Sequence, residues 1–218
     1  MWPETRVGMI KNILFDMGGV IFTQNTEGGY RRFAEIGIDT DKYMGAYGQK
    51  DFFFDVETGA ITEEQFCQKL SETVGREVSW QEAQYCWLGF VDGVEEKRLR
   101  NLETLRLQGY HLCLLSNTNP FIMAHMKSTD FSSLGKPITD YFDTLFCSYE
   151  MQVCKPAPEI FHKVLEMDNM KAEECLFVDD SEKNTKAAEA LGFNVIHTAT
   201  NEDWMEKVKA SICKSAQE

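Results

Sequence analysis

The stretch NILFDMGGV at residues 12–20 decides the fold, because a short apolar run stops at Asp16 and two glycines follow closely. Four later apolar runs are equally short, at 110–116, 144–148, 175–180 and 193–196. Runs of this length that are apolar on both faces are typical of buried parallel strands. The sequence therefore predicts a sheet whose first strand ends at Asp16.

Amphipathic segments separate these runs. Helices are expected at 94–108, 157–167, 181–191 and 202–213, and a glycine follows two of them as a stop signal. Strands that alternate with helices form βαβ units, and right-handed crossovers cover the sheet with helices. The expected fold class is α/β, with a three-layer, Rossmann-like parallel sheet.

Residues 25–92 interrupt this alternation. The segments TEEQFCQKLSETVG and SWQEAQYCWLGFV begin with a Thr or Ser cap and continue as amphipathic helices, and 30–54 is largely helical as well. A structureless loop of this length is uncommon in a compact protein. We expect a core domain of residues 8–24 and 93–218, with an inserted all-helical cap domain of residues 25–92 over the carboxyl edge of the sheet.

The stretch DFFFDVETGAITEEQF at 51–66 has two interpretations. The favoured one is the hydrophobic core of the cap, formed by Phe52, Phe53, Phe54 and Phe66. In the other, residues 57–59 form a cap loop that faces the active site and selects the leaving group. The four histidines have no ligand spacing, so we interpret them as structural.

The composition narrows the functional classes. The 218 residues include 22 Lys and Arg against 35 Asp and Glu, a net charge of −13. Such acidity argues against a general nucleic-acid binder and against docking on anionic lipid. Because the protein as a whole would repel an anionic substrate, a local cation or metal ion has to capture it.

The cysteines and the hydropathy of the sequence indicate the cellular compartment of the protein. The seven cysteines show no CxxC pair and no zinc spacing, which indicates reduced thiols. No apolar window approaches the ~18 residues that span a membrane. The N-terminal stretch lacks the apolar core of a signal peptide. We expect a cytoplasmic protein with no membrane, nucleic-acid or obligate protein partner.

Reactive side chains stand where the expected strands end. Asp16, Ser116 and the pair Asp179–Asp180 close three of the runs, and Lys155 follows another strand-like region. The carboxyl ends of parallel strands meet at one edge, where ligands bind. A carboxylate can attack phosphorus, two carboxylates can share a magnesium ion, and a hydroxyl and an ammonium can bind phosphate oxygens. The set predicts phosphoryl-transfer chemistry.

Four motifs carry a resemblance to a known family: FDMGGVI at 15–21, LLSNTN at 114–119, KPAPEIF at 155–161 and FVDDSEKN at 177–184. The chain resembles the haloacid dehalogenase-like (HAD) hydrolase superfamily over nearly its whole length, with the insert at the C1 cap position. The motif forms are most similar to bacterial sugar-phosphate phosphatases typified by alpha-D-glucose-1-phosphate phosphatase. The resemblance implies a magnesium-dependent phosphatase that hydrolyses a small phosphorylated metabolite, a sugar phosphate above all, through an aspartyl-phosphate.

The resemblance also implies roles for the matching residues. Asp16 corresponds to the nucleophile that becomes phosphorylated. Ser116 and Asn117 correspond to groups that bind the transferring phosphoryl group. Lys155 corresponds to the lysine that neutralises the charge of the nucleophile and the phosphate.

The family's metal site maps onto this chain in the same way. Asp16, the Gly18 carbonyl and Asp180 correspond to the protein ligands of one Mg²⁺ ion. Asp179 is expected to orient these ligands from behind. Asn184 stands where many members carry a second acid.

Gly18 departs from the family pattern, since typical HAD phosphatases carry there an aspartate that protonates the leaving group. The Gly18 carbonyl can still bind a metal, but a positioned acid contributes roughly 10²–10⁴-fold to the rate. We therefore expect activated leaving groups, such as an anomeric oxygen or an acyl phosphate, to be favoured over primary alkyl phosphates. Another residue or a water that supplied the proton would remove this preference.

Two alternatives stay open. Gly18 suggests a non-catalytic phosphate-binding HAD-like protein. A 2-haloacid dehalogenase would use Asp16 to displace halide without magnesium, and it would not need the acidic pair formed with Asp180. A response-regulator receiver does not fit, because its acidic pair precedes its phospho-acceptor, the reverse of the order in this chain.

Overall fold

The core of the protein is a five-stranded parallel sheet, seen in a computed structural model that describes residues 9–45 and 48–215. Its strands are β1 (Asn12–Phe15), β4 (His111–Ser116), β5 (Thr144–Cys147), β6 (Cys175–Asp179) and β7 (Asn194–His197). Their order in the sheet is β5-β4-β1-β6-β7. The chain therefore adds strands on one side of β1 and then returns to its other side, which creates a crevice at the carboxyl end of β1.

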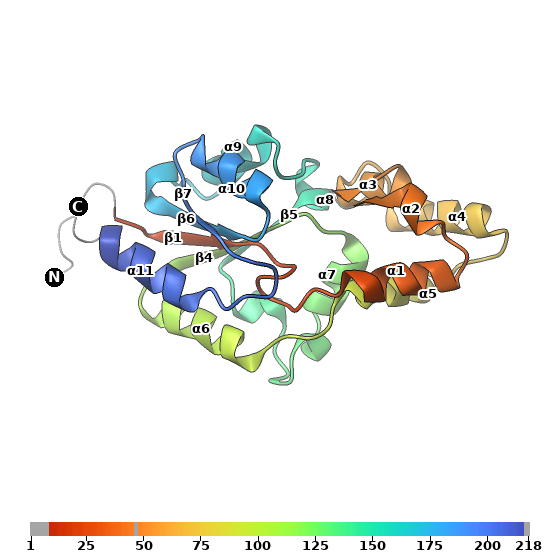
Figure 1. The fold of residues 1–218 in the computed structure, drawn as a ribbon, viewed down its shortest axis with the longest axis horizontal. Coiled ribbons are helices and arrows are strands. Elements are labelled where there is room, and N and C mark those ends of the chain that lie inside the picture. Colours follow the sequence, from red (N-terminus) through yellow and green to blue (C-terminus); the bar gives the residue numbers. More distant parts are fainter. Residues whose placement is uncertain (1–8, 46–47, 216–218) are drawn as a thin grey trace.

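Helices cover both faces of the sheet (Figure 1). They are α6 (Glu96–Leu107) and α11 (Met205–Ser215) on one face, and α9 (Pro158–Met167) and α10 (Glu182–Glu189) on the other. Successive strand residues point to opposite faces, so Ile13 and Phe15 pack with α6 and α11, whereas Leu14 packs with α9 and α10. The three-layer α/β prediction is confirmed, with element ends displaced by three residues at most.

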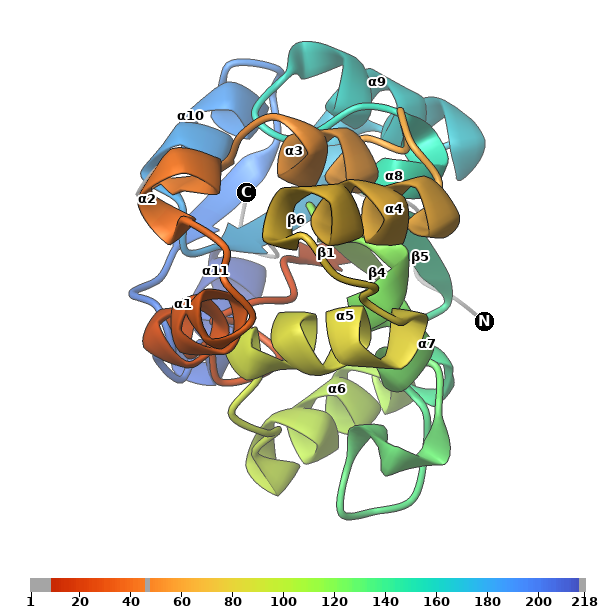
Figure 2. The same cartoon turned by 90° about the vertical axis from the view of Figure 1, so that its right-hand side faces the viewer.

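A second group of helices projects beyond one end of the core, at the right in Figure 1 and nearest the viewer in Figure 2. Its members are α1 (Thr26–Glu35), α2 (Thr40–Tyr43), α3 (Phe52–Glu57), α4 (Glu63–Val74) and α5 (Trp80–Trp87). An antiparallel pair of two-residue strands, β2 (Met44–Gly45) and β3 (Gly48–Gln49), also lies here. In the part of the insert that the structure describes, this short pair therefore adds strands to a segment that was expected to be all-helical.

Aromatic rings hold the cap together. Phe53 lies 5.0 Å from Phe33 and 5.1 Å from Phe66, centroid to centroid, and Phe66 lies 5.8 Å from Trp87. All four are fully buried or nearly so. Phe66 also lies 5.4 Å from Phe121 in the core, so the cap packs against the core through the same cluster. The favoured interpretation of the Phe-rich stretch holds for three of its four rings.

Phe54 is the exception, since 44% of its surface is exposed. Within α3, positions 52, 53 and 56 face the cap interior, and helical periodicity turns position 54 away from it. The expectation that Phe54 belongs to the cap core is wrong for this reason.

Short elements complete the described chain. They are the helices α7 (Pro120–Met126) and α8 (Ser148–Met151), and the 3₁₀ turns η1 (Leu88–Phe90), η2 (Thr129–Phe131), η3 (Ile138–Asp140) and η4 (Ala172–Glu174). The domain limits given above stay predictions, and residues 8 and 216–218 of the expected core lie outside the described residues.

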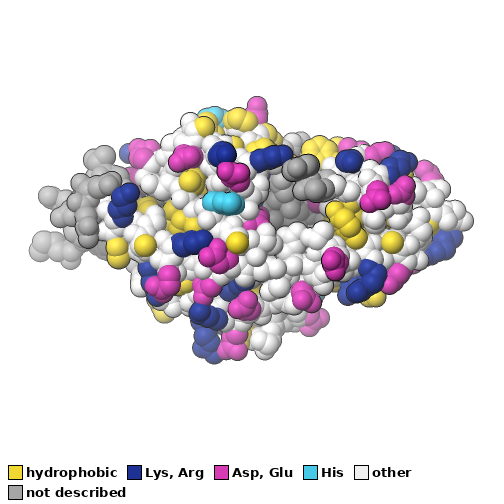
Figure 3. Space-filling view, in the orientation of Figure 1, with side chains coloured by type: hydrophobic (Ala, Val, Ile, Leu, Met, Phe, Trp, Pro, Cys, Tyr) yellow, Lys and Arg dark blue, Asp and Glu magenta, His cyan; other side chains and the backbone are white. Residues whose placement is uncertain are grey.

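Charged side chains of both signs are interspersed over the face shown in Figure 3. All seven cysteines are unpaired thiols. None of the helices found in residues 9–45 and 48–215 has the length and apolar composition that a membrane crossing needs.

Candidate active site

The sheet register places two carboxylates side by side. Phe15 pairs with Leu114 of β4 and with Val178 of β6, so the next residue, Asp16, comes level with Asp179. The Asp16 N–H still donates to the Val178 carbonyl at 2.9 Å, which extends the ladder by one bond. The carboxyl end of β1 is therefore flanked by the end of β6.

Lys155 joins these two carboxylates from the loop between α8 and α9. Its Nζ donates to Asp16 Oδ1, Asp179 Oδ2 and the Leu115 carbonyl, each at 2.7 Å. Only 1% of the Lys155 side chain is exposed, and none of the Asp179 side chain. Three acceptors thus satisfy the three donors of one buried ammonium.

The cluster holds more carboxyl groups than ammonium groups, and its pKa values are shifted from their ordinary values. Burial raises the pKa of Asp16 to about 7, with a further rise from Asp179 and Asp180 and an opposing effect of Lys155. Burial also raises the pKa of Asp180, again with a contribution from Asp179. Burial disfavours the charged form of Lys155, but the two carboxylates beside it outweigh this and raise its pKa. One ammonium therefore faces three carboxyl groups.

This cluster fits a divalent cation of the hard type. Asp16, Asp179 and Asp180 each offer a carboxylate oxygen, and these oxygens lie within 4.8 Å of one another. Oxygen ligands of this kind are those that Mg²⁺ prefers. When all three carboxyl groups are ionised, two negative charges exceed the single charge of Lys155, which matches the charge of one such ion.

Gly19 lets the backbone approach Asp180 closely. Its φ is +72°, and a Cβ at this position would lie 2.6 Å from Asp180 Oδ2 and 2.8 Å from the Thr200 methyl carbon. Thr200 Oγ1 donates to the same carboxylate oxygen at 2.6 Å. The position of Asp180 is thus fixed by the Thr200 hydroxyl on one side and by the Gly19 backbone on the other.

Asp179 is held from behind by the first turn of α10. Its Oδ1 accepts the Ser181 N–H at 2.7 Å and an Asn184 amide hydrogen at 3.1 Å. Ser181 occupies the expected cap position of this helix, but its own hydroxyl makes no cap bond. The Asn184 amide also donates to Asp179 Oδ2 at 3.1 Å, from the position where many family members carry a second acid.

A cavity of about 160 Å³ opens beside this cluster. Of the expected residues, Asp16, Gly18, Ser116, Asn117 and Lys155 line it, whereas Asp180 does not. The Asn117 side chain is bonded in both directions to the Lys155 backbone, at 2.8 Å each. It therefore positions the lysine loop, a role that the sequence did not reveal.

The cap supplies residues that the motifs do not contain. Gln49, Glu57 and Trp87 line the same cavity, as does Thr118 from the loop after β4. Gln49 Oε1, Trp87 Nε1 and Thr118 Oγ1 are buried without a hydrogen-bond partner in the described structure. Unpaired buried polar atoms are costly, so those around a cavity are available to a polar ligand. Thr118 belongs to the motif at 114–119 but had no expected role, and of the three cap residues only Glu57 was anticipated, through the alternative interpretation of residues 57–59.

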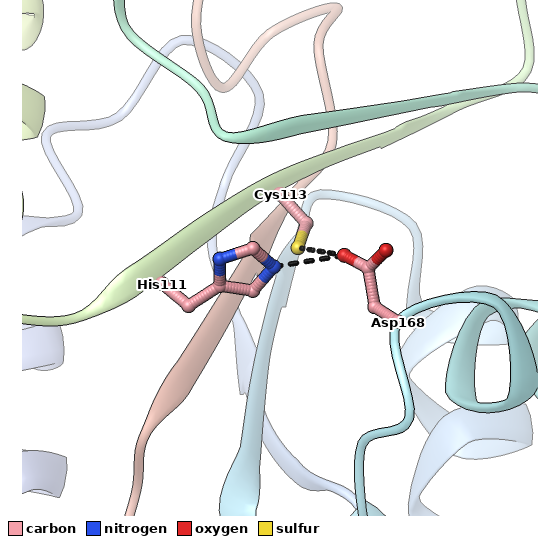
Figure 4. Close-up of side chains that lie close together, drawn as sticks. All are labelled: His111, Cys113 and Asp168. Atoms are coloured by element: carbon pink, nitrogen blue, oxygen red, sulfur yellow. Dashed lines mark hydrogen bonds and ion pairs between the residues drawn. The ribbon is translucent and has the colours of Figure 1, made fainter.

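A second cluster of ionisable side chains joins β4 to the residue that follows α9 (Figure 4). Asp168 Oδ2 lies 2.8 Å from His111 Nε2 and 3.6 Å from Cys113 Sγ. Burial raises the pKa of the Cys113 thiol, which keeps it protonated and a poor metal ligand. This cluster ties the end of α9 to the start of β4, in agreement with a structural role for His111.

Comparisons with known proteins identify the family. The model of the haloacid dehalogenase-like hydrolases matches residues 10–192. D-ribitol-5-phosphate phosphatase from Bacteroides thetaiotaomicron is 38% identical over 201 residues, which cover 92% of this chain and 97% of that enzyme.

Solved structures agree with this. A predicted HAD-like family hydrolase from Porphyromonas gingivalis has a TM-score of 0.88 at 34% identity, covering 94% of this chain and 98% of that one. A HAD family enzyme from Bacteroides thetaiotaomicron, crystallised with magnesium and inorganic phosphate, has a TM-score of 0.82 at 33% identity, covering 91% and 98%. The chain belongs to the family of haloacid dehalogenase-like hydrolases.

Proposed function

We propose that the protein is a magnesium-dependent phosphatase that hydrolyses a small sugar or polyol phosphate through a phosphorylated Asp16. The observation that carries this proposal is the buried Lys155 ammonium bonded to both Asp16 and Asp179 beside a cavity. A lysine in this position neutralises a carboxylate nucleophile and attracts a phosphate, whereas the protein as a whole is acidic.

Each residue of the cluster has a task in this reaction. Asp16 attacks phosphorus, and Lys155 and Ser116 bind phosphate oxygens. Asp16, Asp180 and the Gly18 carbonyl would hold Mg²⁺, with Asp179 orienting the site, and a bound Mg²⁺ offsets negative charge on the phosphate. No backbone N–H of the described residues is bonded to the Gly18 carbonyl, which leaves this oxygen available.

The substrate class rests on two observations. The relative with 38% identity acts on D-ribitol 5-phosphate, as its name states. The buried, unpartnered polar atoms of Gln49, Trp87 and Thr118 around the cavity suit a ligand with several hydroxyl groups. A polyol or sugar phosphate satisfies both.

The two alternatives are less well supported. A dehalogenase does not need the three-carboxylate cluster, and a non-catalytic protein does not need a nucleophile whose charge is balanced by a buried lysine.

The test is phosphate release from D-ribitol 5-phosphate, a sugar 1-phosphate and an aryl phosphate, with Mg²⁺ or with EDTA. We expect turnover only with Mg²⁺, and loss of the magnesium response in Asp180→Ala. Turnover of none of these compounds, or turnover that EDTA leaves unchanged, would contradict the proposal.

A further inference from the structure

The proposed reaction lacks an obvious proton donor. Position 18 is glycine, so no carboxyl two residues after Asp16 can protonate the leaving oxygen. Of the residues that line the cavity, two carry a carboxyl group: Asp16, the nucleophile, and Glu57, at the end of the cap helix α3. Glu57 thus reaches the reaction cavity from the side opposite the sheet.

Glu57 is in the state that a proton donor requires. Burial alone raises its pKa to about 8, so its carboxyl group is mostly protonated at neutral pH. The hydrogen bonds to Glu57 from Ser148 Oγ and Cys154 Sγ both end on its backbone carbonyl and leave its carboxyl group to the cavity. The ionisable groups around it are Asp16 and Lys155 across the cavity and Cys154 beside it, whose pKa burial raises to about 11. A phosphate dianion in the cavity would favour the neutral acid still more.

Contacts between cap and core fix the backbone of Glu57. The buried Ser148 hydroxyl donates to the Glu57 carbonyl at 2.6 Å and accepts the Thr118 N–H at 3.0 Å. Two residues on, Gly59 has a φ of +68°, and a Cβ there would lie 2.1 Å from the Tyr149 carbonyl oxygen. The end of α3 is therefore pressed against α8 and the loop that carries Thr118.

We propose that Glu57 is the general acid that protonates the leaving oxygen, in the place of the acid missing at position 18. This inference rests on the proposed function. As Asp16 forms its bond to phosphorus, the ester P–O bond breaks, its electron pair stays on the leaving oxygen, and the Glu57 proton is transferred to that oxygen. An alcohol leaves. The Glu57 carboxylate then takes a proton from the water that attacks the aspartyl-phosphate, which restores both carboxyl groups and releases inorganic phosphate.

The proposal revises the expectation drawn from Gly18 alone. With a donor in the cap, the wild type should cleave a primary alkyl phosphate such as D-ribitol 5-phosphate efficiently. The alkoxide of such a substrate needs a proton, whereas an aryl leaving group departs without one. The dependence of kcat/KM on leaving-group basicity should therefore be shallow in the wild type and steep once the acid is removed.

The experiment compares wild type, Glu57→Gln and a matched control, Glu72→Gln, which alters an exposed cap glutamate on α4. Each is assayed with Mg²⁺ on D-ribitol 5-phosphate and on p-nitrophenyl phosphate. We expect Glu57→Gln to lose roughly 10²–10⁴-fold in kcat on the alkyl ester and less than about tenfold on the aryl ester. Glu72→Gln should resemble the wild type on both.

Two further readouts separate catalysis from binding. The wild-type kcat/KM on the alkyl ester should fall as pH rises past about 8, where Glu57 of the substrate-free enzyme loses its proton, and this limb should be absent in Glu57→Gln. Ser148→Ala, which releases the Glu57 carbonyl, should lower kcat on the alkyl ester more than on the aryl ester.

An equal loss on both esters, or a rise in KM alone, would show that Glu57 only binds substrate and would overturn the inference. In that case the wild type still turns over with Mg²⁺, whereas failure of the proposed function would leave every variant inactive on both esters.

Discussion

Asp16→Asn should stabilise the metal-free protein at neutral and alkaline pH. The ordinary pKa of this carboxyl is 3.8, and in the fold it is about 7, because burial and two neighbouring carboxylates oppose its ionisation. At about 1.4 kcal/mol for each tenfold change in proton affinity, ionising Asp16 costs the fold about 4 kcal/mol. The folded state binds this proton more tightly, so stability falls as pH rises from 3.8 to 7, and the full cost is present above 7.

The assay is urea denaturation in EDTA at pH 4 and at pH 8. We expect Asp16→Asn to exceed the wild type by up to about 4 kcal/mol at pH 8 and by less than about 1 kcal/mol at pH 4, where Asp16 is neutral in the folded state. Lys155 keeps Asp179 as a partner in the variant. Mg²⁺ at a hundredfold excess over its dissociation constant should restore about 2.7 kcal/mol to the wild type and less to the variant. An identical pH dependence in the two proteins would refute the reasoning.

Two further variants test the backbone beside Asp180 and the separate cluster around His111. Gly19→Ala places a Cβ 2.6 Å from Asp180 Oδ2, so Asp180 must move. The Mg²⁺ concentration for half-maximal activity should therefore rise about 10–100-fold. An unchanged Mg²⁺ concentration for half-maximal activity would contradict this. Asp168→Ala removes the acceptor of His111 and should lower the free energy of unfolding by roughly 1–3 kcal/mol at pH 7 without affecting turnover. Burial opposes ionisation of Asp168, but the His111 hydrogen bond outweighs it and lowers the pKa of Asp168. The stabilisation by Asp168 should therefore be present above pH 3.8 and fade as pH falls further. A difference in stability between the two proteins that does not depend on pH would contradict this.

The core was predictable because its signals are local. Each strand is a short apolar run that ends at a polar residue, and parallel strands bring their carboxyl ends together, so Asp16, Lys155 and Asp179 could be expected at one edge. The role of each side chain there could not be predicted in this way, because it depends on contacts with residues far away in the sequence. The Asn117 side chain proved to hold the lysine loop, because its partner lies 38 residues further along the chain.

The cap was less predictable for the same reason. A phenylalanine at position 54 looks like its neighbours in the sequence, and only the helical phase of α3 turns it to solvent. Glu57 carries no motif, and its role depends on its place in the lining of the cavity and on a contact with Ser148, which is 91 residues away. Packing between the cap helices and the sheet decides such features, and the residue spacing within one segment does not reveal this packing.

The central claim is that the phosphoryl group passes through Asp16. The most direct measurement is an acid quench during turnover of ³²P-labelled D-ribitol 5-phosphate with Mg²⁺, followed by mapping of the label to a peptide. We predict a hydroxylamine-sensitive phosphoryl group on the peptide that contains Asp16, absent with EDTA and absent in Asp16→Asn. Turnover that leaves no label on this peptide, together with activity retained in Asp16→Asn, would contradict the account.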